Sequence, residues 1–353
     1  MLRNLRQRLT FVDLVVWGIG LAIAVAVIWG SAATLIAGKY TWANWFDLTV
    51  SGLALGSIYA LIALGYTMVY GVLKMINFAH SEVFMSGPFT AVFLAKALHA
   101  SGYLDSHPIL SLLMITLLAA SVSCVIAILL ERIAYRPLRG APRLVPLITA
   151  IGASFFLQYT FRGLYGSGIQ AYPTVQILQA AVSLGPVRVF RTQVVVILSA
   201  ILLMLVLYTV VQKTKMGKAM RAVSEDKEVA ALMGIDVDKI IAFTFALGGA
   251  SAGIAGVMYA LMFPVVNFIM GFFPGIKAFT AAVLGGIGNV PGAFLGSMVL
   301  GLVESVGPTL FLDGLGIPAP YQLKDMIAFV ILVFILIVRP TGILGEQLAT
   351  AKA

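Results

Sequence analysis

The sequence contains repeated runs of about 18 or more predominantly apolar residues, and these runs restrict its fold more than any other feature. A run of this length can cross a bilayer as a helix. Within hydrocarbon, every backbone amide must form its hydrogen bond inside the protein, so only helices or a closed barrel can span a membrane. The runs are continuous and do not alternate apolar with polar residues. The sequence therefore predicts an all-α, polytopic helical membrane protein.

The composition agrees with this fold class. Only 10% of the residues are charged and 61% are hydrophobic, whereas about a quarter of a soluble domain is charged. We expect about ten transmembrane or broken helices. The first follows a basic start but is longer than the apolar part of a signal peptide, so we interpret it as a membrane anchor. The expected helices are 14–37, 48–70, 83–98, 109–131, 144–165, 193–211 and 241–262, then two short segments within 276–307 and a last helix at 325–338.

The positions of Lys and Arg predict the orientation, because basic residues concentrate in the cytoplasmic loops of membrane proteins. With the N-terminus inside, 16 of the 23 basic residues fall on the inner side. We therefore expect both termini in the cytoplasm. This asymmetry also explains the net charge of +9, so nucleic-acid binding is an unnecessary hypothesis.

One polar island, residues 217–239, interrupts the apolar sequence on the predicted cytoplasmic side. We expect a short helix there with Ser224 as its N-cap and Gly234 at its left-handed stop. We also expect Asp238 to cap the next membrane helix. The helix can place four small or apolar residues on one face: Ala222, Val229, Ala230 and Met233. A capped helix with such a face favours a docking surface for another protein, and the alternative is a solvated loop that only connects two helices.

Several separated stretches resemble one transporter family. The stretch "EVAALMGIDVDKIIAFTFALGGASAGIAGVMYA" (228–260) resembles the cytoplasmic coupling loop and following helix of ABC importer permeases. Four others are similar to branched-chain amino-acid permeases of the LivH type: "GLALGSIYALIALGYTMVYGVLKMINFAH", "YRPLRGAPRLVPLITAIGASFFLQ", "KAFTAAVLGGIGNVPGAFLGSMVLGLVE" and "RPTGILG". Together they cover roughly residues 48–345. The chain departs from the family at Ser81, where the family usually has Gly, and in the additional helix at 14–37.

The resemblance implies a transmembrane permease domain at 14–345, with a cytoplasmic coupling loop at 217–239 and cytoplasmic tails at 1–13 and 346–353. The implied partners are ABC ATPase subunits, a second permease subunit, an extracytoplasmic substrate-binding protein and the lipid bilayer of a bacterial or archaeal cell (inner) membrane. The residues that would couple to the ATPase are Glu228, Ala230, Ala231 and Gly234.

The sequence contains no G-x-x-x-x-G-K-[ST] motif, so ATP would be bound by partner subunits. We expect no cofactor, no metal site and no catalytic residue in this chain. "GASAG" (249–253) spells G-x-S-x-G, but it lies within a predicted membrane helix and not at the strand-to-helix turn that a nucleophile requires.

Matching residues 190 positions apart suggest where substrate passes. Asn77-Phe78 and Asn267-Phe268 have this offset, and four further identities share it: Phe89/Phe279, Thr90/Thr280, Ala91/Ala281 and Leu94/Leu284. The predicted sidedness of the two dipeptides is opposite, which favours an inverted repeat with the substrate pathway at its interface. Chance identity in apolar-biased sequence is the alternative, and Asn77 can equally serve as a structural cap.

Two ionisable residues remain as candidates. Glu304 lies within a predicted membrane segment, where a carboxylate is functional by default or pairs near a helix end. His80 can gate or titrate, or simply pack. The leading interpretation is an ABC permease for leucine, isoleucine and valine. Its alternatives are an ABC permease for urea, short-chain amides or other amino acids, and, from another class, an ion-coupled secondary transporter.

Overall fold

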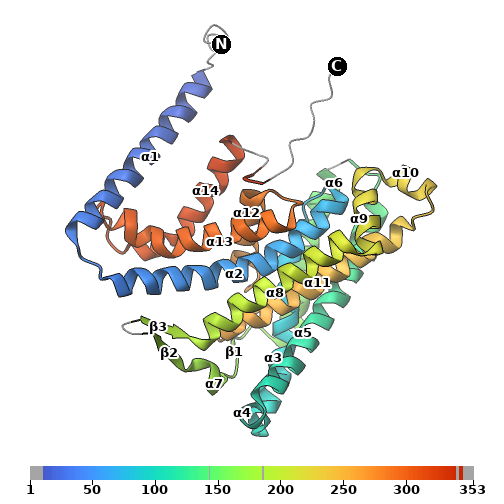
Figure 1. Cartoon of the computed structure of the whole chain (residues 1–353). Coiled ribbons are helices and arrows are strands. Elements are labelled where there is room, and N and C mark those ends of the chain that lie inside the picture. Colours follow the sequence, from blue (N-terminus) through green and yellow to red (C-terminus); the bar gives the residue numbers. More distant parts are fainter. Residues whose placement is uncertain (1–10, 143, 185–186, 339–341, 345–353) are drawn as a thin grey trace.

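The computed structural model describes residues 11–142, 144–184, 187–338 and 342–344, and Figure 1 shows their arrangement. Its elements are α1 (Phe11–Ala37), α2 (Trp42–Leu73), α3 (His80–Ala100), α4 (Tyr103–Ser106), α5 (Pro108–Leu130), the π-helical turn η1 (Glu131–Tyr135), the 3-10 turn η2 (Arg136–Leu138), α6 (Leu144–Tyr165), β1 (Gln170–Ala171), α7 (Gln176–Gln179), β2 (Ala181–Leu184), β3 (Val187–Phe190), α8 (Arg191–Lys213), α9 (Lys215–Glu225), α10 (Lys227–Leu232), α11 (Val237–Met262), β4 (Val265–Val266), α12 (Phe272–Gly285), α13 (Val290–Gly307), the π-helical turn η3 (Pro308–Leu312), the 3-10 turn η4 (Pro320–Leu323) and α14 (Lys324–Val338).

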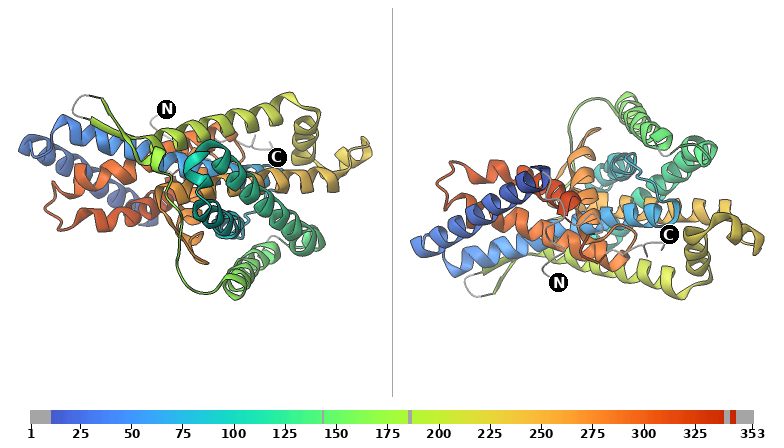
Figure 2. Two further views of the ribbon diagram at one scale, coloured as in Figure 1. Left: turned by 90° about the horizontal axis from the view of Figure 1, so that it is seen from below. Right: turned by 90° about the horizontal axis from the view of Figure 1, so that it is seen from above.

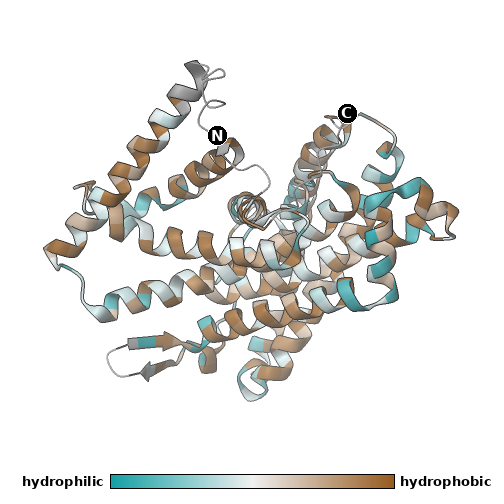
Figure 3. Ribbon diagram, turned by 45° about the horizontal axis from the view of Figure 1, so that its top comes forward, coloured by the Kyte–Doolittle hydropathy of each residue, from teal (hydrophilic) through white to brown (hydrophobic). Residues whose placement is uncertain are grey.

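The predicted membrane helices are confirmed in number and position. Within the described residues, eight helices are long and apolar enough to cross a bilayer, and the shorter α12 and α14 occupy the predicted broken region and last helix. Brown, hydrophobic residues cover the long helices in Figure 3, while teal, hydrophilic residues gather around α9 and α10. The predicted start of the second helix at residue 48 was late. Thr41 and Asn44 form a reciprocal capping box, which starts α2 at Trp42.

Two helices begin deep inside the bundle. The chain leaves α2 through Lys74, which has a left-handed backbone (φ 56°), and α3 then begins beside the middle of α2. A Cβ on Gly65 would lie 2.2 Å from Nε2 of His80, the first residue of α3. The start of α12 is buried in a comparable way, because a Cβ on Gly271 would lie 2.1 Å from the backbone oxygen of Ser81. The N-terminal ends of α3 and α12 therefore meet within the protein.

The helix contacts repeat between the two halves of the chain. α2 packs against α13, and its counterpart α11 packs against α5. Likewise α3 packs against α5 and α6, while α12 packs against α13 and α14. The two long pairs are antiparallel, since Gly52 and Gly56 of α2 face Gly301 and Ser297 of α13 in reverse order. This pattern supports the inverted repeat that the 190-residue offset suggested.

Glycines allow these long helices to approach closely. A Cβ on Gly56 would lie 2.8 Å from the backbone oxygen of Ser297 on α13. In the other pair, a Cβ on Gly253 of α11 would lie 2.4 Å from the backbone oxygen of Ala119 on α5. Small residues at such spacing promote helix association in bilayers. The G-x-S-x-G stretch that contains Gly253 is thus helical and used for packing.

Two small antiparallel strand pairs, β1–β4 and β2–β3, were not predicted. Gln170 pairs with Val266, which joins the segment after α6 to the segment after α11. The chain between α6 and α8 is long because these two helices lie on opposite sides of the molecule in both views of Figure 2. In Figure 1 the β2–β3 hairpin and α4 lie low in the view, far from α9 and α10 at the upper right.

Candidate functional site

The polar island folds into two helices instead of the single one expected from its sequence. Thr214 caps α9, its Oγ1 accepting from the amide of Gly217. Asp226 caps α10, its carboxylate accepting from the amides of Glu228 and Val229. The expectation that Ser224 is the N-cap was wrong. Ser224 lies inside α9, and its hydroxyl donates to the backbone oxygen of Arg221.

The sequence predicted one of two features at the C-terminal end of the island. Gly234 has the expected left-handed backbone, with φ 83°. The expectation that Asp238 caps the next helix was wrong, because Asp236 caps α11 and accepts from the amide of Lys239 at 3.1 Å. A hydrogen bond from the side chain of Lys239 holds the pKa of the Asp236 carboxyl below its usual range.

The exposed face of α10 differs from the expected one. Ala230 is only 3% exposed and packs against the body of the protein, because the turn at Asp226 directs it inward. The side chains of Val229, Leu232 and Met233 are 54%, 87% and 78% exposed. Together with exposed Ala231, these three residues form what we call the docking patch. Glu228 and Gly234 lie exposed beside it.

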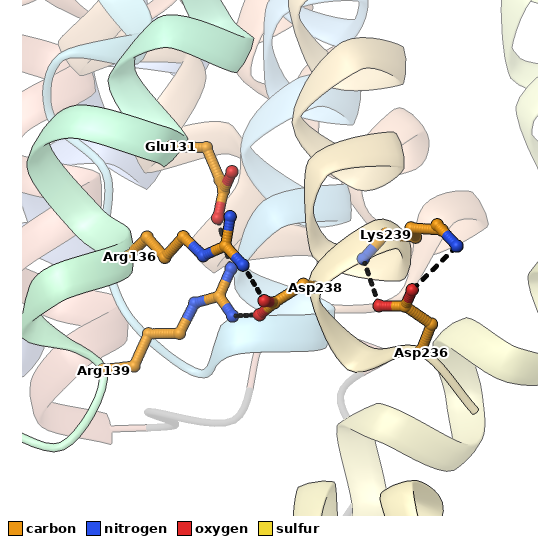
Figure 4. Close-up of polar contacts among 6 residues, drawn as sticks. All are labelled: Glu131, Arg136, Arg139, Asp236, Asp238 and Lys239. Carbon is orange, nitrogen blue, oxygen red and sulfur yellow. Dashed lines mark hydrogen bonds and ion pairs between the residues drawn. The ribbon is translucent and has the colours of Figure 1, made fainter. Parts of the chain in front are cut away.

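A network of ion pairs holds the start of α11 against the segment after α5 (Figure 4). The guanidinium groups of Arg136 and Arg139 both bind the carboxylate of Asp238. Arg139 also pairs with Glu131, which is 1% exposed. Burial lowers the pKa of the Lys227 ammonium in α10, and the nearby charge of Arg139 lowers it further. The island is therefore joined to the membrane bundle by charge as well as by chain connectivity.

The structure places Asn77 and Phe78 in the turn before α3. The Tyr135 hydroxyl donates to Oδ1 of Asn77 at 2.6 Å, and both residues are buried. The backbone oxygen of Asn77 accepts from the amide of His80. Phe78 packs against Phe279 of α12, with ring centroids 5.6 Å apart. Asn77 thus has a structural hydrogen bond, and Phe78 lies between the two broken helices.

Asn267 and Phe268 occupy the corresponding turn before α12. Oδ1 of Asn267 accepts from the amide of Ile269, and its backbone oxygen accepts from the amide of Met270. The guanidinium of Arg162 lies 5.4 Å from the ring centroid of Phe268. The two dipeptides are therefore equivalent turns at separate places, and the structure brings their helices together without bringing the dipeptides into contact.

His80 is 2% exposed and lies edge-on to the ring of Tyr66, at 4.7 Å between centroids. Its Nε2 finds no hydrogen-bond partner among the described residues. This is the packed histidine that we weighed against a gating one.

Glu304 is 2% exposed and belongs to a buried polar cluster. Its carboxylate accepts from Lys277 of α12 at 2.5 Å and from the hydroxyl of Tyr59 at 2.9 Å. Lys277 also pairs with Asp325 at the start of α14. The sequence analysis singled out Glu304 but not its partner Lys277, which it counted among the basic residues of the outer side. A lysine inside an apolar segment was a signal that could have found it.

A second buried carboxylate, Glu82, lies in the first turn of α3 and is 0% exposed. It accepts hydrogen bonds from Gln158 at 2.8 Å and Ser154 at 3.2 Å, both on α6. In the structure it attaches α6 to α3.

Among the described residues, no three His, Cys, Asp or Glu side chains gather as metal ligands would. The absence of a metal site and of a cofactor stays a prediction for the chain.

Comparison with known proteins identifies close relatives. The family model described as "Branched-chain amino acid transport system / permease component" matches residues 48–336. The chain is 45% identical over 308 residues to the high-affinity branched-chain amino acid transport system permease protein BraD of Pseudomonas aeruginosa, covering 86% of this chain and 96% of that one. It is 40% identical over 305 residues to the corresponding LivH protein of Escherichia coli, covering 84% and 94%. A probable LivH permease of Methanocaldococcus jannaschii is 29% identical over 295 residues, covering 82% and 89%.

Proposed function

Because the chain belongs to the family of branched-chain amino acid transport permease components, we propose that it is the membrane-spanning subunit of an ATP-driven ABC importer for leucine, isoleucine and valine. Its task is to form the translocation pathway. The family and the relatives are transport permeases and not enzymes, and the apolar helices make the chain an integral membrane protein.

The observation that carries the proposal is the docking patch on α10. Leu232 and Met233 are among the most exposed apolar side chains of a polar segment, and an exposed apolar group within a polar rim marks a protein contact. The sequence has no phosphate-binding motif of its own, so an ATPase subunit that binds this patch supplies ATP hydrolysis. The basic-residue asymmetry supports a cytoplasmic position for α9, α10 and both termini.

The remaining partners are proposed from the family to which the chain belongs. A second permease subunit completes the pathway, and an extracytoplasmic binding protein delivers substrate at the end opposite α10. The two broken helices α3 and α12 meet inside the bundle, where Phe78 packs on Phe279. An apolar surface of this kind suits a cargo with an aliphatic side chain, and the ends of broken helices can bind its charged groups.

The test is transport in vesicles that contain the permease, its ATPase subunits and its binding protein. We expect ATP-dependent uptake of labelled leucine that unlabelled isoleucine and valine compete away and urea and acetamide do not. Uptake should persist with a protonophore at constant ATP. Competition by urea would show that the proposed substrate is wrong. Loss of uptake with the protonophore would favour the ion-coupled secondary transporter.

A further inference from the structure

The segment 131–139 contains all but the last residue of the "YRPLRG" motif (135–140). Neither docking nor the pathway has so far given it a role. It leaves α5 as a π-helical turn, in which the amide of Arg136 donates to the backbone oxygen of Glu131. A 3-10 turn, Arg136–Leu138, follows directly. Single π-helical turns are rare and are frequent at functional sites. The question is what this irregular segment connects.

One side of the segment is tied to the polar island, which we call the docking loop (217–239). Arg136 and Arg139 both bind Asp238, which lies at the end of this loop, in the first turn of α11. Arg139 also pairs with Glu131, whose carboxylate is nearly inaccessible. A buried carboxylate without its cation is strongly unfavourable, so Glu131 fixes the position of Arg139. Any displacement of Asp238 is thereby transmitted to the segment.

The other side of the segment reaches a broken helix. Tyr135, 1% exposed, donates its hydroxyl to Asn77 at 2.6 Å. Asn77 is 3% exposed, and its backbone oxygen accepts from the amide of His80 at 3.2 Å, where α3 begins. Tyr135 directly precedes Arg136 in the chain. A few residues therefore contact both the end of the docking loop and the turn from which α3 starts.

We propose that the segment 131–139 is the mechanical link between the docking loop and the broken helix α3, with Asp238, Arg139 and Tyr135 as positioning residues. The proposal rests on the proposed function, because it assigns a route by which ATPase closure moves the pathway. A π-helical turn differs from an α-helical one by a single hydrogen-bond register. A shift between these two registers would give the segment the two discrete arrangements that transmission between distant sites requires.

The test uses conservative variants in the vesicle system. Tyr135→Phe removes one hydroxyl and keeps the ring packed against Phe245. A hydrogen bond contributes about 1 kcal/mol, or about fivefold, so we expect leucine imported per ATP hydrolysed to fall about fivefold. Tyr165→Phe is the matched control. It removes a hydroxyl that donates to Thr90, far from the segment, and should leave the ratio unchanged.

The ionic part of the link has its own pair of variants. Asp238→Asn should lower the amount of leucine imported per ATP hydrolysed. Asp238→Glu keeps a carboxylate and should retain the wild-type value. Asp236→Asn is the matched control, because this neighbouring carboxylate makes its ion pair with the exposed Lys239. The double variant of Tyr135→Phe and Asp238→Asn should be no worse than the more severe single variant, as expected for residues that act through one element.

A readout without substrate separates this proposal from the proposed function. In a Cys124→Ser background, a cysteine at position 78 should change its reactivity when ATP binds, and Tyr135→Phe should abolish that change. If wild type shows the change but imports no branched-chain amino acid, the cargo is wrong and the link stands. If the folded Tyr135→Phe and Asp238→Asn variants both retain the wild-type change and ratio, the link is refuted.

Discussion

At the scale of single residues, Lys277 and Glu304 form an ion pair that is buried inside the bundle. Both are less than 10% exposed, and Tyr59 donates a further hydrogen bond to the carboxylate. Moving a charge out of water costs several kcal/mol, and the cost is offset only while partner and hydrogen bonds are in place. The pair therefore joins α12 to α13.

We predict that Lys277→Met lowers the free energy of unfolding by about 3–5 kcal/mol, because it leaves the Glu304 carboxylate buried without a cation. Adding Glu304→Gln should recover most of the loss. Thermal unfolding of the purified protein in detergent measures both. Lys39→Met is the control, since the ion pair of Lys39 with Asp313 is exposed, and it should change the melting temperature little. Equal losses from the two lysine variants would contradict the prediction.

At the scale of elements, α10 presents its docking patch while Ala230 supports it from below. We predict that Leu232→Asp leaves the permease folded but weakens binding to the ATPase by about 30-fold, as expected for a central interface residue worth 2 kcal/mol. Copurification and binding titration with the ATPase measure this. Ile177→Asp, at an exposed apolar residue of α7, is the control. Retention of full affinity by Leu232→Asp would exclude the patch as the docking surface.

The glycine contact between α11 and α5 gives a second prediction for an element. A leucine at Gly253 would overlap the backbone of Ala119, and we expect Gly253→Leu to destabilise the protein by about 1–3 kcal/mol or more through overpacking. Gly163→Leu on α6 is the matched control, because nothing lies within 4 Å of a Cβ there. Thermal unfolding of the two variants side by side should show a loss for Gly253→Leu alone.

The sequence predicted the membrane helices well, because long apolar runs decide their existence. It predicted the capping of the island poorly. Ser224, Asp226, Asp236 and Asp238 are all good N-caps by residue type, and only the tertiary contact with Arg136 and Arg139 removes Asp238 from that set.

Lys277 was missed for a related reason. The broken region was expected to begin at residue 276, but α12 begins one turn earlier, at Phe272. Lys277 was therefore expected at the outer end of the broken region, whereas in the structure it lies in the second turn of α12 and pairs with Glu304. The sequence around the start of α12 is apolar on both sides of the boundary, so no change in pattern marks where this short helix begins. Its boundary depends instead on the packing of Gly271 and Gly275 against Ser81.

At the scale of the whole molecule, the two halves of the chain repeat each other's helix contacts, and the 190-residue offset predicts that the halves are inverted. The turn of Asn77 and the turn of Asn267 start equivalent helices, α3 and α12. In such inverted repeats the pathway opens by movement of one half against the other. Phe78 and Phe268 should then lie on opposite sides of the closed pathway.

We predict that cysteines at positions 78 and 268, each introduced after Cys124→Ser, react with a small membrane-impermeant thiol reagent from opposite sides of the membrane. Binding of ATP or of the substrate-loaded binding protein should change both rates, since the two sides open alternately. Labelling of inside-out and right-side-out vesicles measures this. Reaction of both cysteines from one side would contradict the prediction that Phe78 and Phe268 lie on opposite sides of the closed pathway.

The antiparallel pairing of α2 with α13 also has a consequence for how the protein is made. Ser57 of α2 contacts Met298 of α13, 241 positions later in the chain. At the usual 5–20 residues per second, α2 has therefore been synthesised roughly 10–50 s before its partner leaves the ribosome. During that interval its glycine-lined face is open to lipid and to other nascent helices, so the membrane insertion machinery must shield it. The first half of this permease is thus a biogenesis intermediate that needs protection, because α2 gains its neighbour α13 only after more than 200 further residues have been made.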